Sequence, residues 1–312
     1  MAQTHMEALQ RANAARLIAL CDIDGNAAGR AAQQYGGKAY TSFRKMLKAE
    51  SFEALWVCLP PYAHAGEEME AAAKGIHLYV EKPIALSLSL AREVAAAIRK
   101  AGIISSVGYQ IRYCPHVTEA KRLLRGRRIN MVSARYLCDM RGRAVTWWHT
   151  MSRSGGQLVE QSTHAVDLMR YLAGDIRRVF ATAALREASG IRGWDVPDYS
   201  VVAVDFVSGA IGTIHSSASF PTPQVNGVEI ACSDFELECT FDSVRVTTAE
   251  ETRERRSPVD PLPLAHKAFV DSVVSGNPRG IRSPYSDAVK TLAVTLAANE
   301  SAARGRAVEL AA

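Results

Sequence analysis

The chain has 312 residues, which is enough for two domains of ordinary size. Apolar residues make up 48% of it and the formal net charge is +5, so the composition is that of a globular protein rather than a disordered one. The apolar runs are shorter than the roughly 20 residues of a membrane span, and the amino terminus does not resemble a secretory signal. We therefore expect a cytoplasmic protein without a membrane partner.

The cysteines and the basic residues indicate no special partner. The cysteines form no CxxC pair and no cluster with zinc-ligand spacing, so we expect reduced thiols and no metal site. The basic segment KRLLRGRR, residues 121–128, ends a helical pattern and contains no aromatic residue. A solvated helix end is favoured over a nucleic-acid surface. The six cysteines are Cys21, Cys58, Cys114, Cys138, Cys232 and Cys239.

Residues 15–108 alternate short apolar strands with amphipathic helices. The predicted strands are ARLIALCDI, ALWVCLP, HLYVEKP and ISSVGY. Such alternation is typical of parallel βαβ units, with helices covering the sheet. Ligands bind at the carboxyl ends of the strands in an open parallel sheet. The polar residues that end these strands are therefore candidate site residues.

After residue 112 the pattern changes. A strand at 129–137 and a helix over 157–174 precede six alternating segments between residues 178 and 249. Ser208 and Gly209 separate two of these segments, which predicts a tight hairpin. Helices near 264–276 and 283–305 follow. We expect a parallel-sheet domain over 1–112 and, over 113–312, an α+β domain with a large, mostly antiparallel sheet.

Asp22 ends the first predicted strand. A carboxylate there can accept hydrogen bonds from the ribose hydroxyls of an adenine dinucleotide. It would repel a 2′-phosphate, and the next residue, Ile23, is not basic, so NAD is preferred over NADP. The alternative is that Asp22 or Asp24 only caps the next helix, which explains the residue about equally well.

Two further strand ends carry proline. In CLPPYAH the two prolines enforce an extended backbone, which can lie flat against a nicotinamide or form a plain turn. In YVEKP, Glu81 and Lys82 directly precede Pro83, which restricts the local backbone. A lysine there can stabilise an alkoxide or pass a proton if burial lowers its pKa. An ordinary surface pair of Glu and Lys is the alternative.

The predicted helix from residue 157 has an unusual polar face. Glu160, His164 and Asp167 lie on one stripe at 100° per residue. Carboxylates on both sides of an imidazole would orient it and stabilise its charged form. A solvated face with a chance histidine remains the alternative.

The segments around this helix add weaker signals. Gly155 and Gly156, just before it, permit either a close approach to a ligand or a sharp turn. Trp147 and Trp148 can form an apolar wall for a sugar ring, although core packing is favoured for at least one of them. The last strand end, VGYQIRY, contains the polar Gln110 and Arg112.

Three spaced motifs together resemble those of the Gfo/Idh/MocA family of oxidoreductases. They are LPPYAH, EKP and GGxxxExxxHxxD, and the likeness extends from about Ala2 to the carboxyl terminus. The resemblance implies a Rossmann-type dinucleotide-binding domain and a second domain that binds substrate and forms homo-oligomers. It also implies NAD(P)-linked oxidation or reduction of a sugar, a cyclitol or a related polyol.

The resemblance also implies roles for individual residues. Lys82 matches the catalytic lysine and His164 the general acid/base. The position of Glu160 is commonly Asp in the family; the extra methylene moves the carboxylate by about 1.5 Å, and we expect it to orient the histidine. Expected cofactor contacts are Asp22 at the adenosine ribose, Glu81 near the nicotinamide ribose, and Leu59, Pro60, His64 and Gln110. Expected substrate contacts are Arg112, Trp148 and Asp167.

The opening MAQTHMEAL departs from the family pattern. Family members begin with a strand and a glycine-rich turn, whereas this chain begins within the helix that follows them. The turn would hold a pyrophosphate, and the strand would be central in the sheet. We expect an interrupted, poorly stable sheet. Two interpretations compete with an active enzyme: a non-catalytic sugar- or nucleotide-sensing protein on the same scaffold, and a natural protein that starts upstream of Met1.

Overall fold

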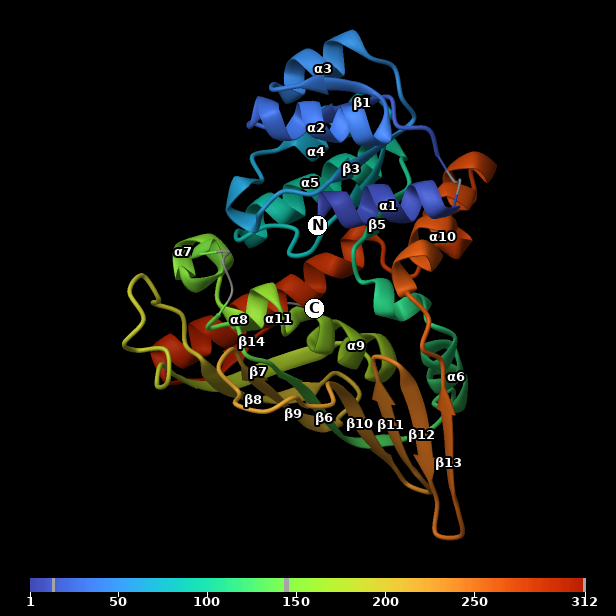
Figure 1. The fold of residues 1–312 in the computed structure, drawn as a ribbon. Helices are drawn as coiled ribbons and strands as arrows, with labels where there is room; N and C mark the ends of the chain where they lie inside the picture. The colour runs from blue at the N-terminus through green and yellow to red at the C-terminus, as the bar shows by residue number, and fades with distance from the viewer. Residues whose placement is uncertain (13–14, 143–145, 311–312) are drawn as a thin grey trace.

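The chain folds into an α/β unit and a large sheet unit that lie one above the other (Figure 1). The computed structural model describes residues 1–12, 15–142 and 146–310. In the first unit, five short strands alternate with helices, and four of these strands were predicted. The elements are α1 (Ala2–Ala12), β1 (Ala19–Cys21), α2 (Gly25–Tyr35), β2 (Lys38–Tyr40), α3 (Phe43–Ala49), β3 (Ala54–Val57), η1 (Pro61–Ala63), α4 (Glu67–Ala72), β4 (His77–Val80), α5 (Leu88–Ala101) and β5 (Ser105–Val107).

The strands of the first unit form two separate parallel sheets. β1 pairs with β2, and β3 pairs with β4, which in turn pairs with β5. The expectation of an interrupted sheet is therefore confirmed. Strand β4 is buried from Leu78 to Val80, whereas β1 is half-buried and ends on the exposed Cys21. The strand β2 was not predicted, because its three residues contain no apolar run.

The second unit is built on a nine-stranded sheet with the order β13-β12-β11-β10-β6-β9-β8-β7-β14. All neighbours are antiparallel except the central pair β6 and β9. The predicted hairpin at Ser208 and Gly209 joins the antiparallel strands β8 and β9. The strands are β6 (Ile129–Leu137), β7 (Ile176–Ala184), β8 (Tyr199–Phe206), β9 (Ile211–Ser217), β10 (Gly227–Cys232), β11 (Glu236–Thr240), β12 (Ser243–Thr247), β13 (Thr252–Arg256) and β14 (Val308–Glu309).

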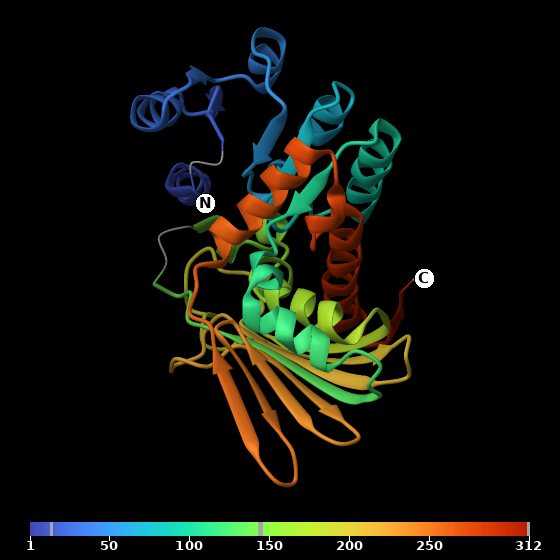
Figure 2. The same ribbon diagram turned by 90° about the vertical axis from the view of Figure 1, so that its right-hand side faces the viewer.

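Helices cover one face of this sheet (Figure 2). The buried side chains of β6, β7 and β8 alternate with exposed ones, as expected for a sheet packed on one side. Strand β13 was not predicted, since all five of its residues are exposed and show no apolar alternation. The remaining helical segments are η2 (Gln110–Tyr113), α6 (Pro115–Leu123), η3 (Thr146–His149), α7 (Met151–Ser154), α8 (Gln157–Glu160), α9 (Thr163–Ala173), α10 (Pro261–Ser275), η4 (Pro278–Gly280) and α11 (Tyr285–Arg304).

The prediction of one continuous helix from residue 157 is wrong. Helix α8 ends at Glu160 and α9 begins at Thr163. The N–H groups of Gln161 and Ser162 both bond to the carbonyl of Gln157, and the Ser162 hydroxyl lies 2.6 Å from that of Ser216 in β9. This contact with a distant strand anchors the chain where the helix is interrupted.

The chain returns to the first unit after the large sheet. Phe269 of α10 packs with Tyr79 of β4, and Tyr285 and Leu292 of α11 join the core around β4 and β5. No disulfide bond joins the cysteines of the described residues. Within the same residues, no helix is long and apolar enough to span a bilayer.

The separation of the two parallel sheets predicts uneven protection of amide hydrogens. Asp22 and Lys38 each donate a hydrogen bond across the β1–β2 pair, and Leu78 and Glu81 donate equivalent bonds within the β3–β4–β5 sheet. Two-stranded sheets are marginal, so the first two amides should exchange about a hundredfold faster in native-state hydrogen exchange. Equal rates would show that the two sheets open as one unit.

Candidate active site

Lys82 reaches from the end of β4 to helix α8 of the second unit. Its ammonium Nζ donates to the Glu160 carbonyl at 2.7 Å and lies 3.2 Å from Glu160 Oε1. Both side chains are 8% exposed, so each charge depends on the other to offset its loss of hydration. The alternative of an ordinary surface lysine is therefore wrong.

His164 lies in the first turn of α9, beside this ion pair. The Tyr109 ring stands perpendicular to the imidazole at 6.2 Å, and the Tyr136 ring stacks on it at 6.4 Å. Burial, and then the positive charge of Lys82, hold the pKa of His164 well below its usual 6.5. The imidazole is neutral at pH 7 and can accept a proton.

The expectation that two carboxylates stabilise a charged His164 is wrong. The break after α8 separates Glu160 from the polar stripe, and its carboxylate turns to Lys82. Asp167 is 2% exposed and binds Arg112 through both oxygens, at 2.7 and 2.5 Å. The side chain that acts on His164 is thus a cation, and it favours the neutral ring.

Arg112 belongs to a buried ionic network where the two units meet. It is 2% exposed, and besides Asp167 it donates to the carbonyl of Arg282 and to Asp287 Oδ2, at 2.7 and 2.6 Å. Asp287 also binds Arg170 at 3.1 Å. Arg112 and Asp167 therefore form these hydrogen bonds within the protein. We do not propose them as substrate contacts.

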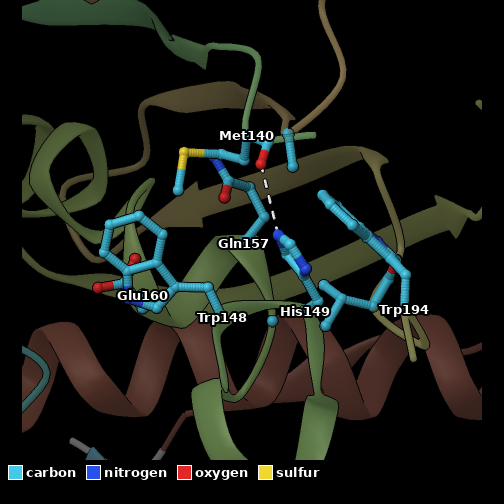
Figure 3. A pocket seen from close by; sticks show the side chains of 9 residues that line it. Met140, Trp148, His149, Gln157, Glu160 and Trp194 are labelled. Carbon is cyan, nitrogen blue, oxygen red and sulfur yellow. Dashed lines mark hydrogen bonds between the residues drawn. The ribbon is translucent and has the colours of Figure 1, made fainter. Parts of the chain in front are cut away.

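A small pocket lined by aromatic rings lies next to Glu160 (Figure 3). The His149 imidazole stacks on Trp194 with ring centroids 4.0 Å apart, and its Nε2 lies 3.4 Å from the carbonyl of Met140. Trp148, expected to wall a sugar, does line this pocket. The full lining is Met140, Trp148, His149, Gly156, Gln157, Glu160, Trp194, Val196 and Ala218.

Several buried polar atoms in this region have no hydrogen-bond partner among the described residues. They are Glu160 Oε2, His164 Nδ1, Trp148 Nε1 and Gln110 Oε1. Leaving such atoms unpaired costs about 1–3 kcal/mol each, and most buried polar groups in proteins are paired. These atoms are suited to hydrogen bonds with a bound ligand that offers both donors and acceptors.

The glycine pair makes the sharp turn between α7 and α8. Gly155 and Gly156 have φ angles of 73° and 84°, which L side chains rarely adopt. A Cβ at Gly155 would lie 2.8 Å from Leu86, and one at Gly156 would lie 3.1 Å from the sulfur of Met151. Close packing and the turn both require glycine, and the turn points α8 at Lys82.

Asp22 and Asp24 have separate roles at the end of β1. Asp24 caps α2 by accepting the N–H of Asn26. Asp22 is exposed, and the hydrogen bond that it accepts from the N–H of Asp24 uses only its Oδ1. Because Asp24 provides the cap, the carboxylate of Asp22 can accept further hydrogen bonds from a ribose.

The remaining predicted cofactor residues follow β3. Leu59 and Pro60 are half-buried, and His64 Nδ1 lies 2.5 Å from Glu68 Oε1, with both of the latter residues buried. The start of α1 lies near the same edge of the sheet, as its effect on Cys58 indicates. Burial raises the pKa of the Cys58 thiol, and the positive amino terminus before α1 opposes this rise. A helix amino terminus suits a pyrophosphate, so these residues fit an NAD-type dinucleotide.

Glu81, expected near a nicotinamide ribose, points into the protein. It is 4% exposed and its Oε1 lies 2.9 Å from His5 Nε2 of α1. Its other oxygen accepts the N–H of Lys82 at 3.1 Å. We therefore do not assign it as a direct cofactor ligand.

Sequence reasoning missed four residues of the site and its surroundings. His149 and Trp194 line the pocket, His5 lies against Glu81, and His266 lies against His5. Each of these residues belongs to a segment without a recognisable motif. The residue that it contacts is distant in sequence or is brought near by a loop. Only the position of His149 directly after Trp147 and Trp148 offered a signal.

Comparison with protein families gives matches to both units. Residues 1–109 match the model described as "Oxidoreductase family, NAD-binding Rossmann fold". Residues 118–238 match the "GFO/IDH/MocA C-terminal domain". The two matches together cover about three quarters of the chain.

Curated relatives match along nearly the whole chain. The D-apiose dehydrogenase of Paraburkholderia graminis is 28% identical, over 99% of this chain and 86% of that protein. The myo-inositol 2-dehydrogenase of Thermotoga maritima is 24% identical, over 98% of this chain and 94% of that protein. A match to an uncharacterized oxidoreductase of Bacillus subtilis is shorter, with 68% of this chain and 63% of that protein covered.

Solved structures share the fold. A levoglucosan dehydrogenase in complex with NADH and levoglucosan aligns with a TM-score of 0.87 at 20% identity. The alignment covers 99% of this chain and 96% of that chain. The Rossmann-type sheet and the large, mostly antiparallel sheet predicted from the sequence are thus confirmed.

The buried ion pair predicts a large stability loss when one charge is removed. Glu160→Gln leaves Lys82 buried without its counter-charge, so the free energy of unfolding should fall by about 3 kcal/mol in urea titrations. Glu254→Gln, which breaks the exposed pair with Arg256, is the matched control and should leave the midpoint unchanged. Equal effects of the two variants would contradict a buried ion pair.

Proposed function

This chain belongs to the Gfo/Idh/MocA family of oxidoreductases, and we propose that it transfers a hydride between NAD and a hydroxyl or carbonyl group of a sugar, cyclitol or related polyol. One observation carries the proposal. A buried lysine ammonium, its paired glutamate and a neutral histidine meet beside an aromatic-lined pocket. Such a set can stabilise an alkoxide and accept a proton in the same place.

In the oxidative direction His164 is the general base. Its neutral imidazole accepts the proton of the substrate hydroxyl, and the low pKa that burial and Lys82 impose keeps it ready to do so. The Lys82 ammonium stabilises the developing alkoxide, while Glu160 holds the ammonium in place through its carbonyl and carboxylate. Reduction reverses these roles.

NAD supplies the hydride acceptor when bound. We assign its adenosine ribose to Asp22, which is exposed at the end of β1. Leu59, Pro60 and His64 follow β3 and, with Gln110, are assigned to the nicotinamide half. The orphan Oε1 of Gln110 is suited to accept a hydrogen bond there. The amino terminus of α1 is assigned to the pyrophosphate.

We assign a ring-shaped, hydroxylated substrate to the side of this pocket, which itself has room for only about one water molecule. Apolar faces of Trp148 and Trp194 suit the C–H faces of a sugar or cyclitol ring, and Trp148 Nε1 can donate to a hydroxyl. Glu160 Oε2 can accept from another. The named activities of the relatives, on D-apiose and myo-inositol, are of this chemical class.

One observation favours the second candidate, a non-catalytic sugar- or nucleotide-sensing protein. The parallel strands form two separate sheets, so the pyrophosphate region lacks the continuous sheet that usually supports it. The buried Lys82 and His164 argue against this candidate, because a binder has no need of a proton acceptor beside a buried cation.

Self-association is also part of the proposal. The helices leave one face of the large sheet open (Figure 2). Exposed apolar side chains on four adjoining strands of this sheet are Met131, Phe180, Val201 and Ile211. Large apolar side chains exposed together on one face of a sheet suit a protein contact. A second copy of this chain is the partner that we propose for this face.

Lys82→Met should abolish turnover while NADH still binds. The substitution removes the charge that stabilises the alkoxide, so kcat should fall by about a hundredfold or more. Lys74→Met is the matched control, because Lys74 binds only the Leu47 carbonyl and should be dispensable for turnover. Turnover of Lys82→Met near that of the unchanged protein would contradict the assignment.

Titration of the unchanged protein with NADH, followed by fluorescence, separates the two candidates. Binding together with NAD-linked oxidation of a polyol supports the enzyme. Binding without turnover on any sugar or cyclitol tested supports the sensing protein. The absence of binding at millimolar NADH contradicts the enzyme for this polypeptide.

The low pKa of His164 predicts the pH dependence of oxidation. The base must be neutral, and it becomes protonated only as the pH falls through a value below 6.5. The rate of NAD-linked oxidation at saturating substrate should therefore be retained from pH 8 down to 6.5 and lost at lower pH. A half-loss at or above pH 6.5 would show that His164 is not the base, or that it is not buried as described.

A further inference from the structure

A chain of three buried ionisable groups lies behind the EKP segment, on the side of Glu81. His5 comes from α1, Glu81 from the end of β4 and His266 from α10. His5 Nε2 lies 2.9 Å from Glu81 Oε1, and His5 Nδ1 lies 2.8 Å from His266 Nε2. The three residues are 1%, 4% and 0% exposed, in the order His5, Glu81 and His266.

Glu81 is held on every side that the structure describes. Its Oε2 accepts the N–H of Lys82, and its Oε1 faces His5. A Cβ at position 108 would lie 2.3 Å from Oε1, so only Gly108 allows the carboxylate to sit against the backbone there. A buried carboxylate requires compensating polar contacts, and the His5 ring supplies a close one at Oε1, although the two atoms do not have hydrogen-bond geometry.

His266 is the neutral end of the chain. Burial, and then the charge of His5, lower its pKa to about 3. The Trp56 and Tyr79 rings contact its ring at centroid distances of 6.0 and 5.0 Å. Its Nε2 is therefore uncharged and completes the hydrogen bonding of His5 Nδ1.

The other ionisable groups around Glu81 do not compete for this role. Burial, and then the Glu81 carboxylate, raise the pKa of the Cys58 thiol and of the Tyr79 phenol, so both stay neutral. Tyr113 contributes to the rise at Tyr79, and the positive amino terminus opposes the rise at Cys58. His5 is the one basic group that the structure places within 3 Å of the carboxylate.

We propose that His5 and His266 are positioning residues for Glu81 and, through the Lys82 backbone, for the Lys82 ammonium. Glu81 accepts the Lys82 N–H, and the Lys82 ammonium in turn binds Glu160. The two histidines thus link α10 and α1 to the group that faces substrate. This inference rests on the proposed oxidoreductase function, but the histidine chain itself can be measured without turnover.

The kinetic test compares two substitutions of His5. His5→Leu removes the imidazole that faces the Glu81 carboxylate, and kcat for NAD-linked oxidation should fall about tenfold to a hundredfold, with NADH affinity within about twofold. His5→Gln keeps an N–H donor and should recover most of kcat near pH 8.

His116→Leu is the matched control. His116 is also fully buried, but it lies in α6 and contacts the Thr240 carbonyl of the second unit. Its substitution should lower thermal stability as His5→Leu does, without moving kcat or the pH profile. A His5→Leu variant that folds and retains kcat within about threefold overturns the positioning role.

The second test needs neither activity nor a folded variant of His5. In protein labelled with ¹⁵N-histidine, the His266 ring, assigned with His266→Leu, should remain neutral down to pH 5. One of its nitrogens should show the shift of a hydrogen bond. A His266 ring that titrates near pH 6.5 contradicts the proposed role of the two histidines. If that ring stays neutral while the unchanged protein neither binds NADH nor oxidises polyols, the proposed function is wrong, but the arrangement of His5, Glu81 and His266 is supported.

Discussion

The ion pair of Lys82 and Glu160 is the contact on which the rest of the site depends. The two charges come from different halves of the fold and are almost fully removed from water. Separating them would leave each charge buried and uncompensated, at a cost of several kcal/mol. The end of β4 and the end of α8 must therefore meet, which in turn requires the tight turn at Gly155 and Gly156 before α8.

The same ammonium has opposite effects on its two neighbours. It compensates the carboxylate of Glu160, and it disfavours protonation of His164. One buried cation thus maintains a charged acceptor and a neutral base close to each other. Neither state would persist if Lys82 were moved into water, because solvent would screen both interactions. Burial at the junction of the two units is what makes one lysine sufficient.

The sequence predicted elements whose pattern is local and missed features that depend on distant partners. Strand β6 was predicted with its observed bounds, since its side chains alternate between core and surface. The interruption after Glu160 depends on a hydroxyl contact between Ser162 and Ser216, which no local pattern encodes. Arg112 and Asp167 were assigned to substrate because neither their mutual ion pair nor the contact of Arg112 with Asp287, more than a hundred residues away, could be read from the sequence. Lys82 and His164 lie close together, as expected from the motifs. The EKP motif marks the end of a strand at the edge of the sheet where ligands bind.

The two ends of the proposed cofactor site are supported unequally. Lys82 follows a strand in the centre of a three-stranded sheet, whereas Asp22 follows a strand of the separate two-stranded sheet. No backbone ladder joins the two sheets in the described residues, so their spacing depends on side-chain packing. Helix α1 is tied to the β4 side through His5 and Glu81, and to α10 through His266. A dinucleotide that spans both ends must therefore use part of its binding energy to hold the two sheets in register, while the geometry around Lys82 is already formed.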